Sequence, residues 1–313
     1  MKGKDLLSIA DLSIDDIRAL LADAADMKAG SNRPSALEGK TLALVFEKPS
    51  LRTRVSFEVA MRQLGGQAIY LSPAEVGLGQ REPAADVARV LCRYVDAIAA
   101  RTFSHSALEI MASYSSVPVI NALSDLEHPC QALADLLTIC EKKGEPVNLT
   151  IAYIGDGNNV ANSLLLVAAL AGANFRIASP PGYSIKDEIL NLARQYAQES
   201  EAEIVCTEEP RIAVTGADVV YTDVWTSMGQ ETEAQKRRQI FADYQVSTEL
   251  LSLASQDAIL MHPLPAHRGE EVTDDALESL QSAVFDQAEN RLHVQKALLL
   301  HMLGGNGAPA SLR

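Results

Sequence analysis

The sequence predicts an α/β protein with two domains. Each domain is a parallel β-sheet flanked by helices, and inter-domain helices join the two. Three observations support this prediction. The chain has 313 residues, about twice the usual length of one domain. Short apolar runs, apolar on both faces as in parallel sheets, alternate with amphipathic segments of helical length. A polar segment with glycine and proline, residues 141–146, separates two such series.

The first series opens with a helix. Ser13 is the expected N-cap, Asp16 stands three residues later as in a capping box, and apolar residues from Ile17 to Met27 repeat with helical spacing. Four strands follow, with helical patterns between them. They are predicted at Thr41–Phe46, Gln67–Leu71, Val95–Ala99 and Val117–Asn121.

The second series follows the polar segment and contains five predicted strands. They are Leu149–Ile154, Phe175–Ala178, Glu203–Cys206, Asp218–Thr222 and Ala258–Met261. A last long helix is predicted from Asp286 to Leu303. We therefore expect one domain over residues 1–142, a second over residues 143–285, and a C-terminal helix in residues 286–313.

Composition excludes several classes of function. With 27 Lys and Arg against 41 Asp and Glu, the formal charge is −14, which argues against general binding of nucleic acid or anionic membranes. No apolar run reaches the length of a membrane span, and the four cysteines form no CxxC pair. We expect a cytoplasmic protein in a reducing compartment, which must bind any anion at a locally basic site.

The densest positive charge follows the first strand. Ser50 is the expected N-cap of the next helix, with Arg52 and Thr53 in its first turn and Arg54 beside them. Unpaired backbone N–H groups and the helix dipole favour an anion there, and arginine at a helix start needs one for compensation. Spacing alone leaves two interpretations, a phosphate or carboxylate site and a solvated first turn with surface arginines.

Residues 50–54 resemble the Ser-x-Arg-Thr-Arg carbamoyl-phosphate motif of the aspartate/ornithine transcarbamoylase family. The segment 128–131 is similar to the family's His-Pro-x-Gln motif, although a lone histidine near a helix start is usually structural or solvated. The resemblance covers about residues 5–303. It implies that the following residues bind carbamoyl phosphate: Ser50, Leu51, Arg52, Thr53, Arg101, His128, Gln131, Leu264 and Arg291. It also implies that the last helix packs back on the carbamoyl-phosphate domain.

The turn Gly155-Asp156-Gly157 follows a strand and opens a helix. It begins like a dinucleotide fingerprint, but Val160 stands where the third glycine belongs. By itself the turn is compatible with an NAD-dependent dehydrogenase or with a simple tight turn. The family resemblance instead assigns Asn159 to the amino-acid substrate, with Asn158 as the alternative if the register differs by one.

Two later segments concern the second substrate. The loop after the Asp218–Thr222 strand is similar to the Asp-x-x-x-Ser-Met-Gly loop of the ornithine enzymes, in which Asp223 provides an anion for an ammonium group. Residues 262–265 read His-Pro-Leu-Pro, as in the aspartate enzymes, whereas ornithine enzymes carry cysteine in place of Pro263. The continuation 266–271 favours ornithine. The implied ornithine-binding residues are Asn159, Asp223, Ser227, Met228, Pro263 and Leu264.

The resemblance implies transfer of a carbamoyl group from carbamoyl phosphate to the δ-amine of L-ornithine, as in arginine biosynthesis. The implied catalytic residues are Arg52, Arg101, His128 and Asp223, with no metal and no cofactor. The family forms homotrimers with sites near subunit interfaces, so we expect the same here, and we expect neither nucleic acid nor membrane as a partner. Related transcarbamoylases acting on acetylornithine, putrescine or aspartate remain the main alternatives.

Overall fold

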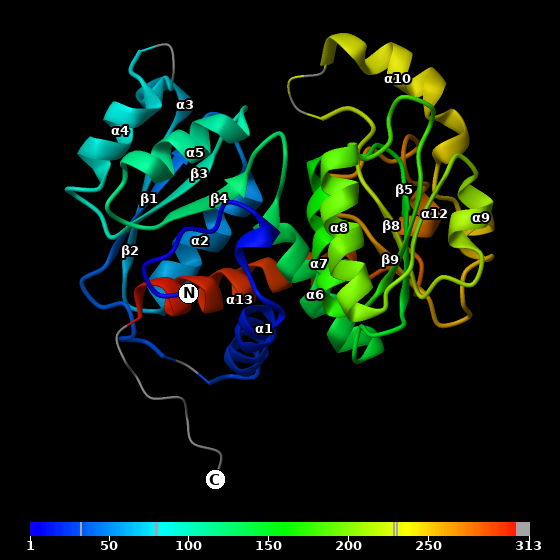
Figure 1. Cartoon of the computed structure of the whole chain (residues 1–313), viewed down its shortest axis with the longest axis horizontal. Coiled ribbons are helices and arrows are strands. Elements are labelled where there is room, and N and C mark those ends of the chain that lie inside the picture. Colours follow the sequence, from blue (N-terminus) through cyan, green and yellow to red (C-terminus); the bar gives the residue numbers. More distant parts are fainter. Residues whose placement is uncertain (32, 79–80, 228, 230, 305–313) are drawn as a thin grey trace. The chain divides into compact units, whose positions relative to one another are not determined.

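The computed structural model describes residues 1–31, 33–78, 81–227, 229 and 231–304 (Figure 1). They form two compact units. The first unit contains Met1–Cys130 and the segment that starts at Arg291, and the second contains Gln131–Asn290. Each unit is a parallel sheet flanked by helices, which confirms the predicted fold class.

The first unit is built on a parallel sheet with the order β2-β1-β3-β4. Its strands are β1 (Thr41–Phe46), β2 (Gln67–Leu71), β3 (Ala97–Arg101) and β4 (Val119–Leu123). β1 and β2 have the predicted bounds. The prediction for β3 ended at its apolar residues, whereas the ladder with β1 continues to Arg101, which lies opposite Phe46.

The helices of the first unit follow the strands. They are η1 (Ile9–Asp11), α1 (Ile14–Lys28), α2 (Leu51–Gln63), α3 (Pro73–Val76), α4 (Ala84–Leu91) and α5 (His105–Tyr114). The predicted capping box of α1 is present, since the Asp16 N–H donates to Ser13 Oγ at 3.1 Å and the Ser13 N–H to Asp16 Oδ2 at 3.2 Å. Its apolar face from Ile17 to Met27 is buried.

The second unit is built on a parallel sheet with the order β7-β6-β5-β8-β9. Its strands are β5 (Thr150–Ile154), β6 (Asn174–Ala178), β7 (Ile204–Thr207), β8 (Val219–Thr222) and β9 (Ile259–Met261), each within two residues of its predicted bounds. Its helices are α6 (Pro129–Lys143, which begins at the end of the first unit), α7 (Asn159–Ala171), α8 (Asp187–Ser200), α9 (Pro210–Val214), η2 (Glu231–Glu233), α10 (Ala234–Ile240), η3 (Ala242–Tyr244), α11 (Thr248–Leu251) and α12 (Asp274–Leu277). No helix in the described ranges is long and apolar enough to cross a membrane.

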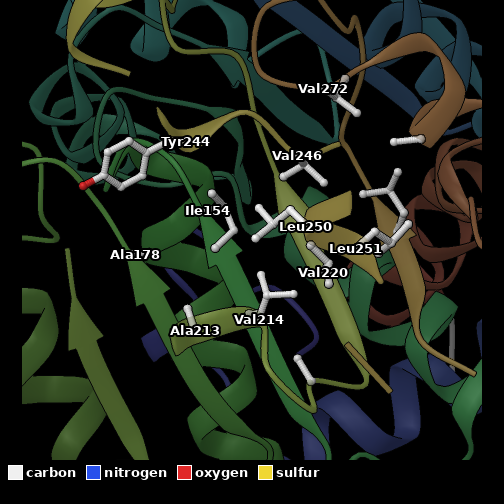
Figure 2. Packing of buried hydrophobic residues seen from close by; sticks show 14 of the residues in the cluster. Ile154, Ala178, Ala213, Val214, Val220, Tyr244, Val246, Leu250, Leu251 and Val272 are labelled. Carbon is white, nitrogen blue, oxygen red and sulfur yellow. The ribbon is translucent and has the colours of Figure 1, made fainter. Parts of the chain in front are cut away.

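An aliphatic core lies against one face of the second sheet. Figure 2 shows Ile154 and Val220 of neighbouring strands with Val214, Val246 and Leu251 packed around them. In Figure 1, α7 and α8 lie on one side of this sheet and α9 on the other. Strands covered on both faces have no solvent-facing side, which explains their near-continuous apolar sequence.

Both sheets reverse their strand order in the middle. From β1 the chain moves to β2 on one side and then to β3 on the other, and from β5 it moves to β6 and later to β8. In open α/β sheets, ligands bind at the carboxyl ends of the strands that flank such a reversal. The ends of β1 and β3, and those of β5 and β8, are therefore the places to search for a site.

Two helices contribute residues to both units. α13 (Val284–Leu303) begins in the second unit, where Asn290 Nδ2 donates to Thr138 Oγ1 at 3.0 Å and to Glu141 Oε2 at 2.7 Å. The next residue, Arg291, donates instead to Thr53 of the first unit. The boundaries between the two compact units therefore lie inside α6 and α13. The sequence predicted these boundaries near residue 142, in the polar segment, and near residue 286, at the start of the last helix.

Candidate active site

The start of α2 lies at the carboxyl end of β1. As predicted, Ser50 is the N-cap: its Oγ accepts from the Thr53 N–H at 3.3 Å and donates to Thr53 Oγ1 at 3.0 Å. These contacts fix the first turn of α2, in which Leu51 is exposed and Thr53 is fully buried. Backbone N–H groups of a first helical turn have no intrahelical acceptor, so this turn presents donors and a positive dipole end.

Three arginines of the first unit form a positive cluster beside this turn. Arg101, at the end of β3, is only 6% exposed, Arg291 is 3% exposed, and Arg52 is half-buried. Burial, together with the charges of Arg291 and Arg52, lowers the pKa of Arg101 to about 9. The buried Nε of Arg101 has no hydrogen-bond partner among the described residues. Such a cluster suits a small dianion with several oxygens.

Arg54 does not belong to this cluster, although the sequence placed it there. Its Nε donates to Glu58 Oε1 at 2.9 Å, one helical turn away, and its guanidinium stacks on the Tyr70 ring at 3.9 Å. Successive residues of a helix point about 100° apart, so Arg52 and Arg54 cannot both face one ligand. Arg291 provides the third guanidinium instead.

His128 precedes α6 and belongs to the same unit as the arginines. It is 4% exposed, and burial together with the charges of Arg291 and Arg101 lowers its pKa well below the usual range. The imidazole is therefore neutral at physiological pH. A neutral imidazole donates one hydrogen bond without adding positive charge.

Gln131 is held by a buried acid that sequence analysis missed. Its Nε2 donates to Asp135 Oδ1 at 2.8 Å, while its Oε1 has no donor among the residues that the structure describes. Asp135 also accepts from Gln287 Nε2 at 2.7 Å and from the Tyr221 hydroxyl at 3.0 Å. The signal in the sequence was the i,i+4 spacing of Gln131 and Asp135, which places them on one helix face.

Asp223 lies at the carboxyl end of β8 and is 8% exposed. Its Oδ2 accepts from Asn158 Nδ2 and its Oδ1 from the Val224 N–H, both at 2.8 Å. Burial raises the pKa of Asp223, while His262 and the hydrogen bonds oppose that rise. A buried carboxylate whose two hydrogen-bond donors are both neutral amides suits an ammonium ligand.

Asn158 and Asn159, in the turn after β5, make different contacts. Asn158 is the N-cap of α7, and its Oδ1 accepts from the Val160 and Ala161 N–H groups at 2.9 and 3.1 Å. Because its amide nitrogen binds Asp223, both ends of the Asn158 side chain are engaged within the protein. Asn159 is half-exposed in the first turn of α7 and is not the cap.

Gly157 explains the resemblance of this turn to a dinucleotide fingerprint. A Cβ at this position would lie 2.3 Å from the nitrogen of Ile185 and 2.5 Å from the carbonyl carbon of Ser184. The Gly157 N–H donates to the Tyr183 carbonyl at 2.7 Å. In a dinucleotide site the second glycine admits a pyrophosphate. Here the protein's own backbone lies against the glycine, which argues against the dehydrogenase alternative.

The loop after β8 is tied to the same turn by Arg237 of α10, which the sequence did not indicate. Arg237 Nη1 donates to Asp156 Oδ2 at 2.7 Å and to the Trp225 carbonyl at 2.9 Å. Ser227 follows in this loop and is half-buried. Met228, the other predicted residue of the loop, lies outside the described residues.

The side chain of His262 fixes the backbone of the segment that follows β9. His262 Nδ1 accepts from the Leu264 N–H at 2.9 Å, so Nε2 carries the hydrogen and donates to Glu271 Oε1 at 3.0 Å. Leu264 has φ = 53°, in the left-handed region, and follows the buried Pro263. This ring therefore fixes the direction of the carbonyl groups at residues 263 and 264.

One group of side chains near this segment has the composition of a cation site. Ligand atoms of His267, Glu270 and Glu271 lie within 4.8 Å of one another. However, Glu270 Oε1 accepts from Arg238 Nε at 2.9 Å, and Glu271 Oε1 is bound by His262. Both acids already have protein donors, so we assign no metal to them.

Two models of known protein domains match most of the chain. The carbamoyl-P binding domain model of the aspartate/ornithine carbamoyltransferases matches residues 4–141, and the Asp/Orn binding domain model matches residues 147–302. The chain belongs to the aspartate/ornithine carbamoyltransferase family.

Its relatives are similar over nearly their whole length. The ornithine carbamoyltransferase of Anoxybacillus flavithermus is 54% identical over 306 residues, covering 97% of this chain and 98% of that protein. The enzyme of the same name from Hyperthermus butylicus is 56% identical over 306 residues, covering 96% and 98%. The solved structure of the Pyrococcus furiosus enzyme has a TM-score of 0.94 at 51% identity, covering 97% of this chain and 98% of that chain.

Proposed function

We propose that this carbamoyltransferase transfers the carbamoyl group of carbamoyl phosphate to the δ-amine of L-ornithine and releases L-citrulline and phosphate. The observation that carries the choice of ornithine is the buried Asp223 in the Asp-x-x-x-Ser-Met-Gly loop, because an internal carboxylate suits an ammonium-bearing substrate. The ornithine carbamoyltransferases that are 54% and 56% identical to this chain support it.

The first unit would bind the phosphate. Arg52, Arg101 and Arg291 supply positive charge, and the Ser50–Thr53 turn supplies N–H donors. Phosphate bears more negative charge after the carbamoyl carbon–oxygen bond breaks, so this cluster stabilises the leaving group more strongly than the substrate.

Thr53 would donate to the carbamoyl oxygen. Its Oγ1 already accepts from Arg291 Nη2 at 2.6 Å and from Ser50 Oγ at 3.0 Å. A hydroxyl has two acceptor positions and one hydrogen, so the hydrogen of Thr53 must point to another acceptor. With Arg101 and neutral His128, this donor would meet the negative charge that develops on the oxygen during attack.

The second unit would bind the amine substrate and the carbamoyl nitrogen. Gln131 Oε1 and the Leu264 carbonyl would accept from the carbamoyl amine. Asn159, Asp223, Ser227 and Met228, with the carbonyl of Pro263, would hold ornithine. The attacking δ-nitrogen forms the new bond to carbon through its lone pair, so it must lose its proton before attack. No cofactor and no metal take part in this proposal.

Other transcarbamoylase substrates are the second candidates. The presence of Pro263 favours aspartate, but the buried Asp223 carboxylate would repel a dicarboxylate. Acetylornithine and putrescine also carry a free amine, so they require a direct test. The protein is incubated with carbamoyl phosphate and, separately, ornithine, acetylornithine, putrescine or aspartate, and each carbamoylated product is measured. Citrulline is the expected product, and its absence would refute the proposal.

We propose a cytoplasmic homotrimer that works in the direction of arginine biosynthesis. A relative from Pyrococcus furiosus, 51% identical, is an anabolic ornithine carbamoyltransferase. Leu51, Val55 and Ile69 are 76%, 46% and 49% exposed, and Leu51 adjoins Arg52, which suits a site near a subunit interface. Sedimentation of the protein at micromolar concentration should give a trimer, and a monomer would contradict this assembly.

A further inference from the structure

A buried series of hydrogen-bonded polar side chains leads from the backbone of His262, directly after β9, to Gln131. The His262 N–H donates to Gln287 Oε1 at 2.8 Å, and Gln287 Nε2 donates to Asp135 Oδ1 at 2.7 Å. The same Asp135 oxygen accepts from Gln131 Nε2 at 2.8 Å. Asp135, His262 and Gln287 are 0% exposed and Gln131 is 1% exposed, so solvent cannot replace these partners.

The first of these hydrogen bonds fixes the orientation of Gln287. A backbone N–H can only donate, so it fixes Gln287 with Oε1 toward His262 and Nε2 toward Asp135. The Asp135 carboxylate accepts from Gln287 and from the Tyr221 hydroxyl, which accepts in turn from Gln287 Nε2 at 3.1 Å. Since Asp135 Oδ1 also accepts from Gln131 Nε2, the NH2 group of Gln131 faces Asp135.

We propose that Asp135 is a positioning residue that forces Gln131 to present its carbonyl oxygen as a hydrogen-bond acceptor to the transferred group. The side chain of a glutamine has a donor end and an acceptor end, and either could face a ligand. Asp135 occupies the donor end and leaves Oε1, which has no donor among the described residues. A group with an N–H, such as the carbamoyl amine, is thereby selected over a methyl or alkoxy group of similar size.

This inference rests on the proposed function, because it names what Gln131 recognises in carbamoyl phosphate. Its test uses two stable probes that differ only at the recognised group. Phosphonoacetamide carries an NH2 group where acetonylphosphonate carries a methyl group. A site that hydrogen-bonds a buried polar group discriminates strongly against an analogue without it. We expect the wild-type protein to bind the amide probe at least about tenfold more tightly by isothermal titration calorimetry.

Three variants of the full-length protein test the role of Asp135. Asp135→Leu keeps a branched side chain and removes the acceptor, so the preference for the amide probe should fall to within about twofold. Asp135→Asn retains an oxygen that can face both glutamines, so the preference should persist. Tyr221→Phe is the matched control, because it removes a buried partner of Asp135 without removing the contact with Gln131. The first unit is proposed to bind the phosphate, so the affinity of each of the three variants for inorganic phosphate should remain within about threefold of the wild-type value.

A folded Asp135→Leu protein that keeps the tenfold preference would overturn the proposal, as would a wild-type protein without one. If Asp135→Leu shows no cooperative thermal transition, Asp135→Ala decides, because it removes the same acceptor from Gln131 Nε2 without adding volume to the buried site. Loss of the preference in a folded Asp135→Ala protein supports positioning by Asp135, and an unchanged preference overturns it. Absence of citrulline formation with an intact preference would refute the proposed function and leave the positioning role standing.

Discussion

Arg291 Nη2 donates a 2.6 Å hydrogen bond to Thr53 Oγ1, joining two residues 238 positions apart in the chain. Thr53 lies in the first turn of α2, and Arg291 is the residue at which α13 passes into the first unit. The bond fills one acceptor position of the hydroxyl and brings a third guanidinium to the arginine cluster. Both consequences can be measured.

Thr53→Val should lower kcat by about 100-fold, because removal of one preorganised donor to a developing oxyanion has effects of this size. Affinity for phosphate should change by less than about fivefold, since the arginines remain. Thr53→Ser is the control, because it keeps the hydroxyl and should retain most of the activity. Steady-state kinetics of citrulline formation give kcat for both variants. Equal losses of kcat in Thr53→Val and Thr53→Ser would exclude the donor role.

Arg52→Ala should nearly abolish turnover, because it removes the guanidinium beside the helix start that is proposed to hold the phosphate. The matched control is Arg54→Ala, two residues away on the same helix. Arg54 pairs with Glu58 and is exposed, so its loss should change kcat/KM by less than about threefold. An Arg52→Ala protein within tenfold of wild-type activity would contradict the assigned role.

Asp223→Asn should raise the KM for ornithine by about 100-fold or more, since a buried charge pair with the ammonium is lost. The KM for carbamoyl phosphate should change by less than about threefold. Asp243→Asn, which removes the same charge from an exposed position, should leave both constants near wild type.

Asp223 should also make the affinity for ornithine depend on pH. Burial raises the pKa of Asp223 above its ordinary value, so the carboxylate takes up a proton at a higher pH than an exposed aspartate. Ornithine affinity should therefore be present above that pKa and fall as pH decreases through it. Deprotonation of the δ-amine also gives an acid limb, so a plot of log kcat/KM for ornithine against pH should be steeper below the pKa of Asp223 in the wild type. Asp223→Asn should lose this additional slope and keep only the slope that the amine causes.

His128 should remain neutral across the physiological range. Burial and the charges of Arg291 and Arg101 lower its pKa, so protonation requires a pH well below the usual 6.5. The imidazole carbon resonance of His128, assigned by loss in His128→Asn, should not shift between about pH 5.5 and 8. Saturating inorganic phosphate should raise the pKa by neutralising the arginines. A titration midpoint near pH 6.5 in the free protein would contradict the lowered pKa of His128.

Gly157→Ala should destabilise the second unit by about 1–3 kcal/mol, because the new Cβ would overlap the backbone of Ser184 and Ile185. Trp225 is the only tryptophan and is buried in this unit, so its fluorescence reports the transition. The midpoint of urea unfolding should decrease. Gly157 is not among the glycines with a positive φ, so the expected loss comes from crowding and not from backbone strain. An unchanged midpoint would show that residues 184 and 185 move to admit the methyl group.

Local sequence signals predicted most of the fold. The capping box at Ser13 and Asp16 fixed the start of α1, and each predicted strand is present within about two residues. These features depend on neighbours within a few positions, which a linear sequence displays directly. The end of β3 at Arg101 was missed because its pairing with Phe46 depends on a partner 55 residues away.

The site was predicted in part, because its motifs are contiguous but its partners are not. Ser50 as N-cap and Asp223 at a strand end followed from patterns along the chain. Gln287 and Arg237 were missed, since each acts on a residue of another segment. Asp135 lies one helical turn from Gln131, but the spacing alone does not show that this face of the helix is buried. The sequence could not show that Asn158 rather than Asn159 binds Asp223, because this contact joins residues 65 positions apart.

The sequence by itself determined the alternation of strands and helices, the acidic surface and the order of the carbamoyltransferase motifs, because each is encoded in runs of adjacent residues. Tertiary structure decided which side chains share a site. It brought Arg291 to Thr53, turned Arg54 toward Glu58, and set the donor end of Gln131 against Asp135. Hydrogen bonding and burial act between atoms close in space, so their outcome appears only when the chain is folded.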